Sequence, residues 1–208
     1  MKRIRLTTRA GVEARPKRDK KRQAVEPPGP GNALTADQYM DHWNARKVWT
    51  HLERPKHLKR LHWCADQAQG ELFADVGCAL GHSTAIMKAR RPGAWIGIDF
   101  SRKATDEAPK VFPEIPFRYA EDILALARLG PVDTAICSEV IEHVEAPELL
   151  LMALARLARK RVVLTTPAID AQDPGHMRLY TLETLQDQLK AYRATIIQDK
   201  DFFYVTID

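Results

Sequence analysis

The sequence predicts an α/β fold in which helices cover a mostly parallel β-sheet. From residue 69 onward, short apolar runs typical of buried strands alternate with longer stretches of helical periodicity. Such alternation favours parallel strands that are joined by crossover helices. The last two apolar runs, 195–198 and 202–207, follow each other without a helix between them, and they predict an antiparallel terminal strand.

The N-terminus differs in composition from the rest of the chain. The 208 residues are enough for one well-buried domain with an extension. Residues 1–22 carry a charge balance of +8 within a chain total of +5, so the remaining residues are slightly acidic. We expect residues 1–31, which end in the Pro- and Gly-rich run 27–31, to be a disordered basic tail. The tail either binds nucleic acid through phosphates or is a solvated extension.

Other features of the composition concern the cellular compartment. No apolar run approaches the length of a membrane span, and the first residues lack the apolar core of a signal peptide. The three cysteines do not have the spacing of metal ligands, so free buried thiols in a reducing compartment are expected. We therefore expect a cytoplasmic protein, and the sequence makes no prediction of its oligomeric state.

Two helices are expected over residues 32–68. The first has Thr35 as its N-cap, with Gln38 three residues further on, and it ends near Glu53, ahead of a proline. The second covers about 56–67. Three of the four tryptophans lie in this region, where they serve either as an apolar lid over a pocket or as ordinary core packing.

The most informative stretch joins a predicted strand to a predicted helix. The apolar run 72–76 is typical of a buried strand, and a turn with Gly77 and Gly81 follows it. The next residues have a helical pattern that Ser83 or Thr84 can cap. A helix N-terminus then lies beside an open crevice, which suits a nucleotide-like ligand.

An acidic residue lies near the end of the next predicted strand. This strand, 94–100, carries Asp99, which is 24 residues after Asp75. In a strand–helix–strand unit, an acid at this point reaches the ribose hydroxyls of a bound nucleoside. The dinucleotide fingerprint G-x-G-x-x-G fails, because Ala79 and His82 occupy its second and third glycine positions.

Asp75, Gly77 and Gly81 instead fit the D-x-G-x-x-x-G form of class I S-adenosylmethionine (SAM) methyltransferases, and residues 35–208 resemble that superfamily. The resemblance implies a seven-stranded Rossmann-like methyltransferase fold with SAM as the cofactor. The domain would cover 32–208, with the SAM-binding core at 69–208. The implied SAM-binding residues are Asp75, Gly77, Cys78, Ala79, Gly81, Asp99, Phe100, Glu121, Asp122, Ile123, Ser138 and Glu139.

The remaining elements continue the alternation. Helices are expected from a Ser101 cap to about Pro109, up to Leu129, over 146–158 and after a Thr181 cap, and strands at 116–120, 132–137 and 161–167. Ligands in such sheets bind outside the carboxyl ends of the strands. There the family places an acid on the adenine amine, here Glu121 or Asp122, and an apolar residue on the ring, here Ile123. Alternatively, the two acids only cap the next helix.

The segment after the fourth strand carries the expected catalytic residues. Glu139, Glu142 and His143 lie here, and the segment resembles ubiquinone-biosynthesis O-methyltransferases. It is also similar to small-RNA 3′-terminal ribose 2′-O-methyltransferases, by which Glu139, Glu142, His143 and His176 would bind Mg²⁺ or Mn²⁺. Without a metal, His143 is expected to be the general base and Glu142 to anchor the loop. Alternatively, His143 only packs against the cofactor.

Three functions follow from these features. The first is a SAM-dependent methyltransferase that moves a methyl group to an O or N acceptor on a small or carrier-linked molecule. The second is a nucleic-acid methyltransferase that uses the basic tail, 1–22, and a metal. The third is a SAM-binding assembly subunit without catalysis.

Overall fold

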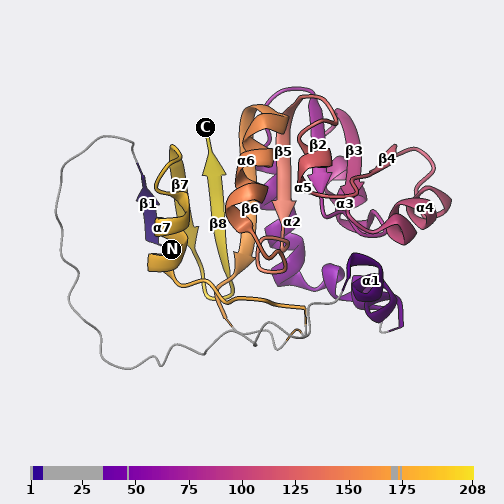
Figure 1. The fold of residues 1–208 in the computed structure, drawn as a ribbon, viewed down its shortest axis with the longest axis horizontal. Helices are drawn as coiled ribbons and strands as arrows, with labels where there is room; N and C mark the ends of the chain where they lie inside the picture. Colours follow the sequence, from indigo (N-terminus) through magenta and orange to yellow (C-terminus); the bar gives the residue numbers. More distant parts are fainter. Residues whose placement is uncertain (1, 7–34, 46, 170–172, 174) are drawn as a thin grey trace.

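The computed structural model describes residues 2–6, 35–45, 47–169, 173 and 175–208 (Figure 1). Within these residues, one eight-stranded sheet has the order β1-β7-β8-β6-β5-β2-β3-β4. The strands are β1 (Lys2–Arg5), β2 (Leu72–Val76), β3 (Ala94–Asp99), β4 (Phe117–Tyr119), β5 (Val132–Ser138), β6 (Ala158–Pro167), β7 (Ala194–Gln198) and β8 (Phe202–Ile207). The pairings from β4 through β6 are parallel, and those made by β8 and β1 are antiparallel.

Helices lie on both faces of this sheet. They are α1 (Ala36–Ala45), the 3₁₀ helix η1 (Val48–Glu53), α2 (Pro55–Gln67), α3 (His82–Arg90), α4 (Arg102–Val111), α5 (Ile123–Leu126), α6 (Pro147–Leu157) and α7 (Leu182–Leu189). One core cluster joins the sheet to α5, α6 and α7, and a second joins it to α2 and α3. No helix in the described ranges combines the length and the apolar character needed to cross a membrane.

The alternation of side chains along β2 explains why its sequence is apolar except at Asp75. Phe73 is fully buried in the cluster with Leu61 and Met87, whereas its neighbour Ala74 lies in the cluster on the opposite face. Successive residues of a strand point to opposite faces, so a strand covered on both sides needs apolar residues on both faces. This is why the continuous apolar run predicted a central strand correctly.

The predicted fold is confirmed, with eight strands where seven were expected. The additional strand, β1, comes from the part of the chain that was expected to be a disordered tail, 1–31. β1 pairs with β7, with Ile4 opposite the buried Ile196, and Leu6 packs against the same core cluster. An apolar residue between basic ones lets a short edge strand bury one face and leave Arg5 in solvent.

The rest of the predicted tail, 7–31, lies outside the described residues. It contains most of the basic residues on which the predicted contact with nucleic acid depends. That contact therefore stays a prediction.

The first predicted helix is interrupted. Thr35 and Gln38 form the expected reciprocal cap, in which the Thr35 N–H donates to Gln38 Oε1 (2.9 Å) and the Gln38 N–H to Thr35 Oγ1 (3.2 Å). However, α1 ends at Ala45, and η1 starts after Lys47, whose φ of 48° is left-handed. A left-handed residue cannot continue an α-helix, so the continuous helix expected up to Glu53 was wrong. The second predicted helix corresponds to α2.

The docking of β1 can be tested with two substitutions on the same strand. Ile4→Asp should lower the free energy of unfolding by about 1–2 kcal/mol, because it places a carboxylate against the apolar core beside Ile196. Arg5→Asp is the matched control, because Arg5 is exposed and its loss should change stability by less than about 0.5 kcal/mol. Urea unfolding monitored by circular dichroism measures both values. Equal, negligible effects would mean that β1 is not part of the folded sheet in solution.

Candidate functional site

The turn between β2 and α3 contains three residues with left-handed backbone conformations, Gly77 (φ 80°), Ala79 (φ 48°) and Gly81 (φ 84°). A Cβ atom at Gly77 would lie 2.3 Å from Val140 Cγ2, so the turn after β5 packs directly on this glycine. The N–H groups of Gly77 and Cys78 already donate to the carbonyl of Ile98. Val140 therefore packs closely against the backbone of this turn, and these two N–H groups are not free donors.

Asp75 holds this turn from inside the fold. It is 1% exposed, and Oδ2 accepts hydrogen bonds from Ser83 Oγ (2.8 Å) and Thr84 Oγ1 (2.6 Å). Burial raises the pKa of the Asp75 carboxyl. Ser83 and Thr84 were expected to cap α3, but the cap residue is Gly81 and the two hydroxyls bind Asp75. The reason is the buried carboxylate, which needs donors that water cannot supply.

Asp99 lies at the end of β3, next to the glycine turn. Its two carboxylate oxygens accept the N–H groups of Ala79 (2.7 Å) and Ser101 (2.8 Å). Burial is the main cause that raises the Asp99 pKa to about 6, against the opposing effect of these N–H groups. Each carboxylate oxygen has a further lone pair, so the group can accept two more hydrogen bonds from a neighbouring diol. The next residue, Phe100, is half-buried.

The other residues of the predicted cofactor site differ in exposure. Cys78 is 2% exposed, and burial raises its pKa, so it is a packed thiol and not a nucleophile. Asp122 caps α5 by accepting the N–H of Ala125, which is the alternative role that the sequence left open. Glu121 is exposed and lies 3.8 Å from Arg128, a pair of little energetic weight. Ile123 begins α5 and is partly buried against the core.

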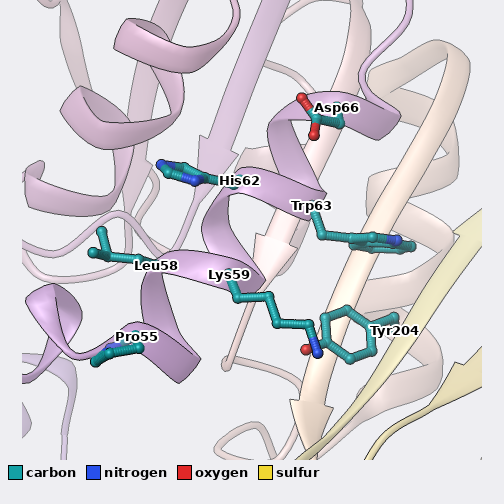
Figure 2. A pocket seen from close by; sticks show the side chains of 7 residues that line it. All are labelled: Pro55, Leu58, Lys59, His62, Trp63, Asp66 and Tyr204. Carbon is teal, nitrogen blue, oxygen red and sulfur yellow. The ribbon is translucent and has the colours of Figure 1, made fainter. Parts of the chain in front are cut away.

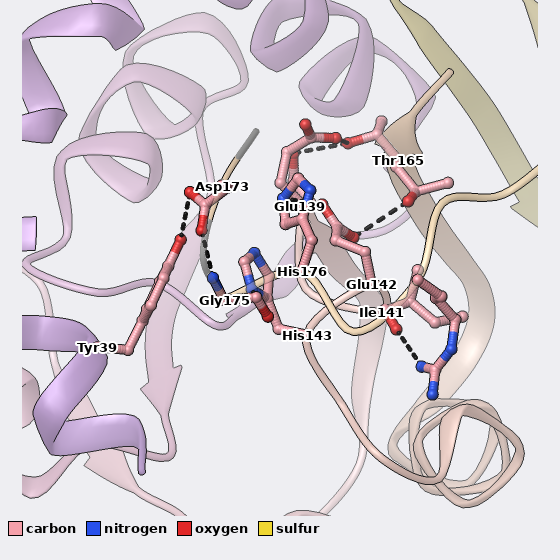
Figure 3. Close-up of polar contacts among 12 residues, drawn as sticks. Tyr39, Glu139, Ile141, Glu142, His143, Thr165, Asp173, Gly175 and His176 are labelled. Carbon is pink, nitrogen blue, oxygen red and sulfur yellow. Dashed lines mark hydrogen bonds and ion pairs between the residues drawn. The ribbon is translucent and has the colours of Figure 1, made fainter. Parts of the chain in front are cut away.

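Glu139 follows β5 in a left-handed conformation, with φ 61°. Its Oε2 lies 2.8 Å from Arg60 Nη1, and its Oε1 accepts a hydrogen bond from Thr165 Oγ1 at 3.2 Å (Figure 3). Thr165 Oγ1 also lies 2.8 Å from the hydroxyl of Ser138. Arg60 on α2 is only 3% exposed. The two charges are therefore paired inside the protein, which is the condition for burying them.

Glu142 is the most deeply buried acid of this segment, at 1% exposure. Its Oε2 accepts a hydrogen bond from Thr166 Oγ1 (3.1 Å), whereas Oε1 is buried without a hydrogen-bond partner among the described residues. Burial, together with repulsion from Glu139, raises the Glu142 pKa well above its usual range. His176 Nε2 lies 4.0 Å from Oε1. A cation or a proton at this oxygen would satisfy it.

His143 lies between Tyr39 and His176, with ring centroids 4.8 Å and 4.7 Å away (Figure 3). Its Nδ1 is 2.9 Å from the carbonyl oxygen of Gly175. A carbonyl only accepts, so Nδ1 carries the proton and the neutral ring keeps a lone pair on Nε2. Burial is the main cause that lowers the His143 pKa to about 4.

The structure brings together three of the four predicted metal ligands. Each of Glu142, His143 and His176 offers a ligand atom, and these atoms lie within 4.8 Å of one another. Glu139 is not in this group, because Arg60 and Thr165 engage its carboxylate.

Two arginines that support this site were not identified from the sequence. Arg60 is buried on α2 together with Leu61 and Cys64. A basic residue on an apolar helix face was the one sequence feature that could have predicted a buried ion pair here. Arg178 donates to the carbonyls of Ile141, Val144 and Glu145, and so it holds the turn that carries Glu142. Contacts between distant segments of this kind leave no local pattern.

A cavity of about 480 Å³ lies elsewhere, between α2 and β8 (Figure 2). Its lining residues are Pro55, Leu58, Lys59, His62, Trp63, Asp66 and Tyr204. None of the predicted site residues is among them, and we assign it no role in the chemistry.

The fold and the glycine turn, followed by an acid at the end of β3, define a class I methyltransferase. Residues 48–198 match a family described as a methyltransferase domain, and the chain belongs to this family. The resemblance to SAM-dependent methyltransferases that the sequence suggested is thereby confirmed.

Individual relatives agree with this assignment. The chain is 35% identical over 126 residues to a ubiquinone biosynthesis O-methyltransferase of Paracidovorax citrulli, covering 53% of this chain and 52% of that protein. It is 32% identical over 146 residues to the protein of the same name from Cupriavidus pinatubonensis, covering 66% and 51%. The chain thus spans about half the length of the curated relatives it matches.

A solved structure has the same fold at low sequence identity. The N-methyltransferase NodS from Bradyrhizobium japonicum, in complex with S-adenosyl-L-homocysteine (SAH), superposes with a TM-score of 0.65 at 17% identity. The match covers 84% of this chain and 98% of NodS.

The close approach at Gly77 predicts a large effect of a small substitution. Gly77→Ala should destabilise the fold by about 2–4 kcal/mol, because a left-handed alanine costs about 1–2 kcal/mol and the clash with Val140 adds an overpacking cost. Gly130→Ala is the matched control, because Gly130 has a similar φ of 89° but no atom within 4 Å of the added Cβ. Urea unfolding of both variants measures the difference. Equal losses of stability would mean that the Val140 contact does not constrain the turn.

Proposed function

We propose that this chain is a SAM-dependent methyltransferase that transfers a methyl group to a hydroxyl oxygen of a small or carrier-linked molecule. The observation that carries the proposal is His143, whose Nδ1–H donates to Gly175 and leaves Nε2 as a proton acceptor. This base lies on the turn that packs against Gly77 through Val140. The names of the two curated relatives support an oxygen acceptor.

The residues proposed to hold SAM lie at or after the carboxyl ends of β2, β3 and β4. SAM supplies an electrophilic methyl group on a sulfonium, so the protein mainly has to align the reactants and exclude water. The two glycines give the turn its left-handed backbone, which leads the chain into the N-terminus of α3. Asp99 is proposed to accept the two ribose hydroxyls, and Glu121, Asp122 and Ile123 are proposed to lie around the adenine.

His143 is proposed to remove the proton of the acceptor hydroxyl. Burial keeps its ring neutral at physiological pH, so Nε2 can accept a proton, but a pKa of about 4 makes it a weak base. Glu142 is proposed to orient this turn through its hydrogen bond with Thr166.

The same residues fit a divalent metal. Glu142 Oε1 is buried without a partner, and the Nδ1–H of His143 donates to a carbonyl, as is usual for a metal-binding histidine. Glu142, His143 and His176 would hold Mg²⁺ or Mn²⁺, which would lower the pKa of a bound hydroxyl. Glu139 would need to leave Arg60 to become a fourth ligand.

Methyl transfer can be measured directly. With tritiated SAM, Mn²⁺ and a panel of mono- and 1,2-dihydroxybenzoates, the wild type should label a hydroxyl. His143→Asn should lower kcat by about 10²–10⁴-fold, the usual contribution of a general base. His62→Asn, at the cavity beside α2, is the control and should retain activity. A wild type that binds SAH but labels no hydroxyl in the panel would favour the assembly-subunit hypothesis.

Removal of metal gives a separate result. EDTA should abolish labelling if the metal is required, and calorimetry should show Mn²⁺ binding that Glu142→Gln weakens by at least about tenfold. Unchanged activity after EDTA would leave His143 as a base that acts without a metal.

The Asp99 pKa predicts how cofactor binding depends on pH. Only the ionised carboxylate accepts both ribose hydroxyls, so the affinity for SAH should be constant above pH 6 and fall about tenfold per pH unit below it. The sign follows from the raised pKa, because protonation of free Asp99 competes with the ligand already at mildly acidic pH. Calorimetry between pH 5 and 8 measures this. Asp99→Asn should bind weakly with no step at pH 6, and a wild-type affinity without that step would contradict the role of Asp99.

A further inference from the structure

The helix α1 contacts the chain beside Asp99. Asp37 Oδ1 accepts hydrogen bonds from Ser101 Oγ (2.6 Å) and from the N–H of Lys103 (3.3 Å), at the first turn of α4. The N–H of Ser101 in turn donates to Asp99 Oδ1 (2.8 Å). Ser101 is fully buried. One buried residue therefore joins α1 to the proposed ribose-binding carboxylate.

The same helix contacts His143 through Tyr39 (Figure 3). The hydroxyl of Tyr39 donates to Asp173 Oδ2 (3.1 Å), and Asp173 Oδ1 accepts the N–H of Gly175 (2.8 Å). The carbonyl of Gly175 is the group that accepts the proton on His143 Nδ1. A Cβ at Gly175 would lie 2.6 Å from the Tyr39 ring and 3.0 Å from His143 Nδ1, so the three residues are in close contact.

Between these two contacts, α1 packs on the glycine turn. Met40 is 3% exposed and forms a small core cluster with Leu80 and Ala104. In consequence, α1 contacts the turn, the end of β3 and the His143 segment, which together surround the proposed site.

We propose that Tyr39 is a positioning residue for His143, and that cofactor bound at Asp99 stabilises α1 in the position that holds Tyr39 there. This inference rests on the proposed function, in which Asp99 binds ribose and His143 is the base. Cofactor bound to Asp99 immobilises Ser101, Ser101 holds Asp37, and α1 is thereby held with Tyr39 against Gly175 and His143. The contacts that orient the His143 ring are therefore more stable when the methyl donor is bound.

The chain offers a matched control on the same helix. Asp41 also links α1 to α4, through an ion pair with Lys103 Nζ at 2.7 Å, but both side chains are more than half exposed. Exposed pairs of this kind contribute little, and, among the described residues, the Asp41 side chain bonds Lys103 and not Ser101. If α1 is only packed on the domain, Asp37→Asn and Asp41→Asn should behave alike.

The first test needs no acceptor. Hydrogen exchange of residues 36–45 is measured with and without saturating SAH, after calorimetry has shown that each variant binds it. SAH should slow exchange by at least tenfold in the wild type and in Asp41→Asn, and by less than twofold in Asp37→Asn. Slowing of the same size in Asp37→Asn would overturn the coupling.

The second test follows the His143 proton. In protein with ¹⁵N-labelled histidine and bound SAH, the Nδ1–H signal, assigned with His143→Gln, should exchange with solvent at least tenfold faster in Tyr39→Leu. Tyr39→Phe keeps the ring on His143 and should show a smaller change. An unchanged exchange rate in Tyr39→Leu would overturn the role of Tyr39. A wild type that does not bind SAH would instead overturn the proposed function.

Discussion

The packing of Val140 on Gly77 is the contact on which the site depends. It joins the turn after β2 to the turn after β5, so it sets the distance between the proposed cofactor half of the site and the half that carries Glu142 and His143. Glycine is required at 77 both by its φ of 80° and by the 2.3 Å approach that a side chain would make. The buried Asp75 carboxylate also holds this turn, by accepting hydrogen bonds from the hydroxyls of Ser83 and Thr84 on α3.

The parts of the fold that the sequence predicted correctly are those that local pattern determines. A central strand covered on both faces is mainly apolar on both, and this pattern identified β2, β3 and β5. A turn with left-handed positions needs glycine, which identified Gly77 and Gly81. Because β2 and β3 are parallel neighbours, their carboxyl ends meet, and the sequence could place Asp75 and Asp99 at one edge. Glu142, His143 and His176 came from a family resemblance, and the structure brings them together.

The remaining features depend on contacts between segments that are distant in the sequence. β1 looked like part of a charged tail, because Ile4 meets Ile196 on the opposite strand only in the folded sheet. The helix breaks at Lys47, where the sequence contains no glycine or proline that would predict a break. The ion pair of Arg60 with Glu139 joins α2 to the end of β5, and neither residue predicts the other. Tertiary contacts determine each of these features, and the conformational preference of the local sequence does not.

The ion pair of Arg60 and Glu139 also explains the charge of the site. Two carboxylates, Glu139 and Glu142, lie in a buried segment, where like charges cannot both ionise without compensation. The positive charge of Arg60 compensates the carboxylate of Glu139. The contacts of this carboxylate with Arg60 and Thr165 also hold Glu139 in a left-handed backbone conformation, which costs about 1 kcal/mol or more. As metal ligands, Glu142 and the two imidazoles would carry at most one negative charge, because a histidine binds a metal in its neutral form. Such a set would leave surplus positive charge on a divalent ion, which favours an ionised acceptor oxygen.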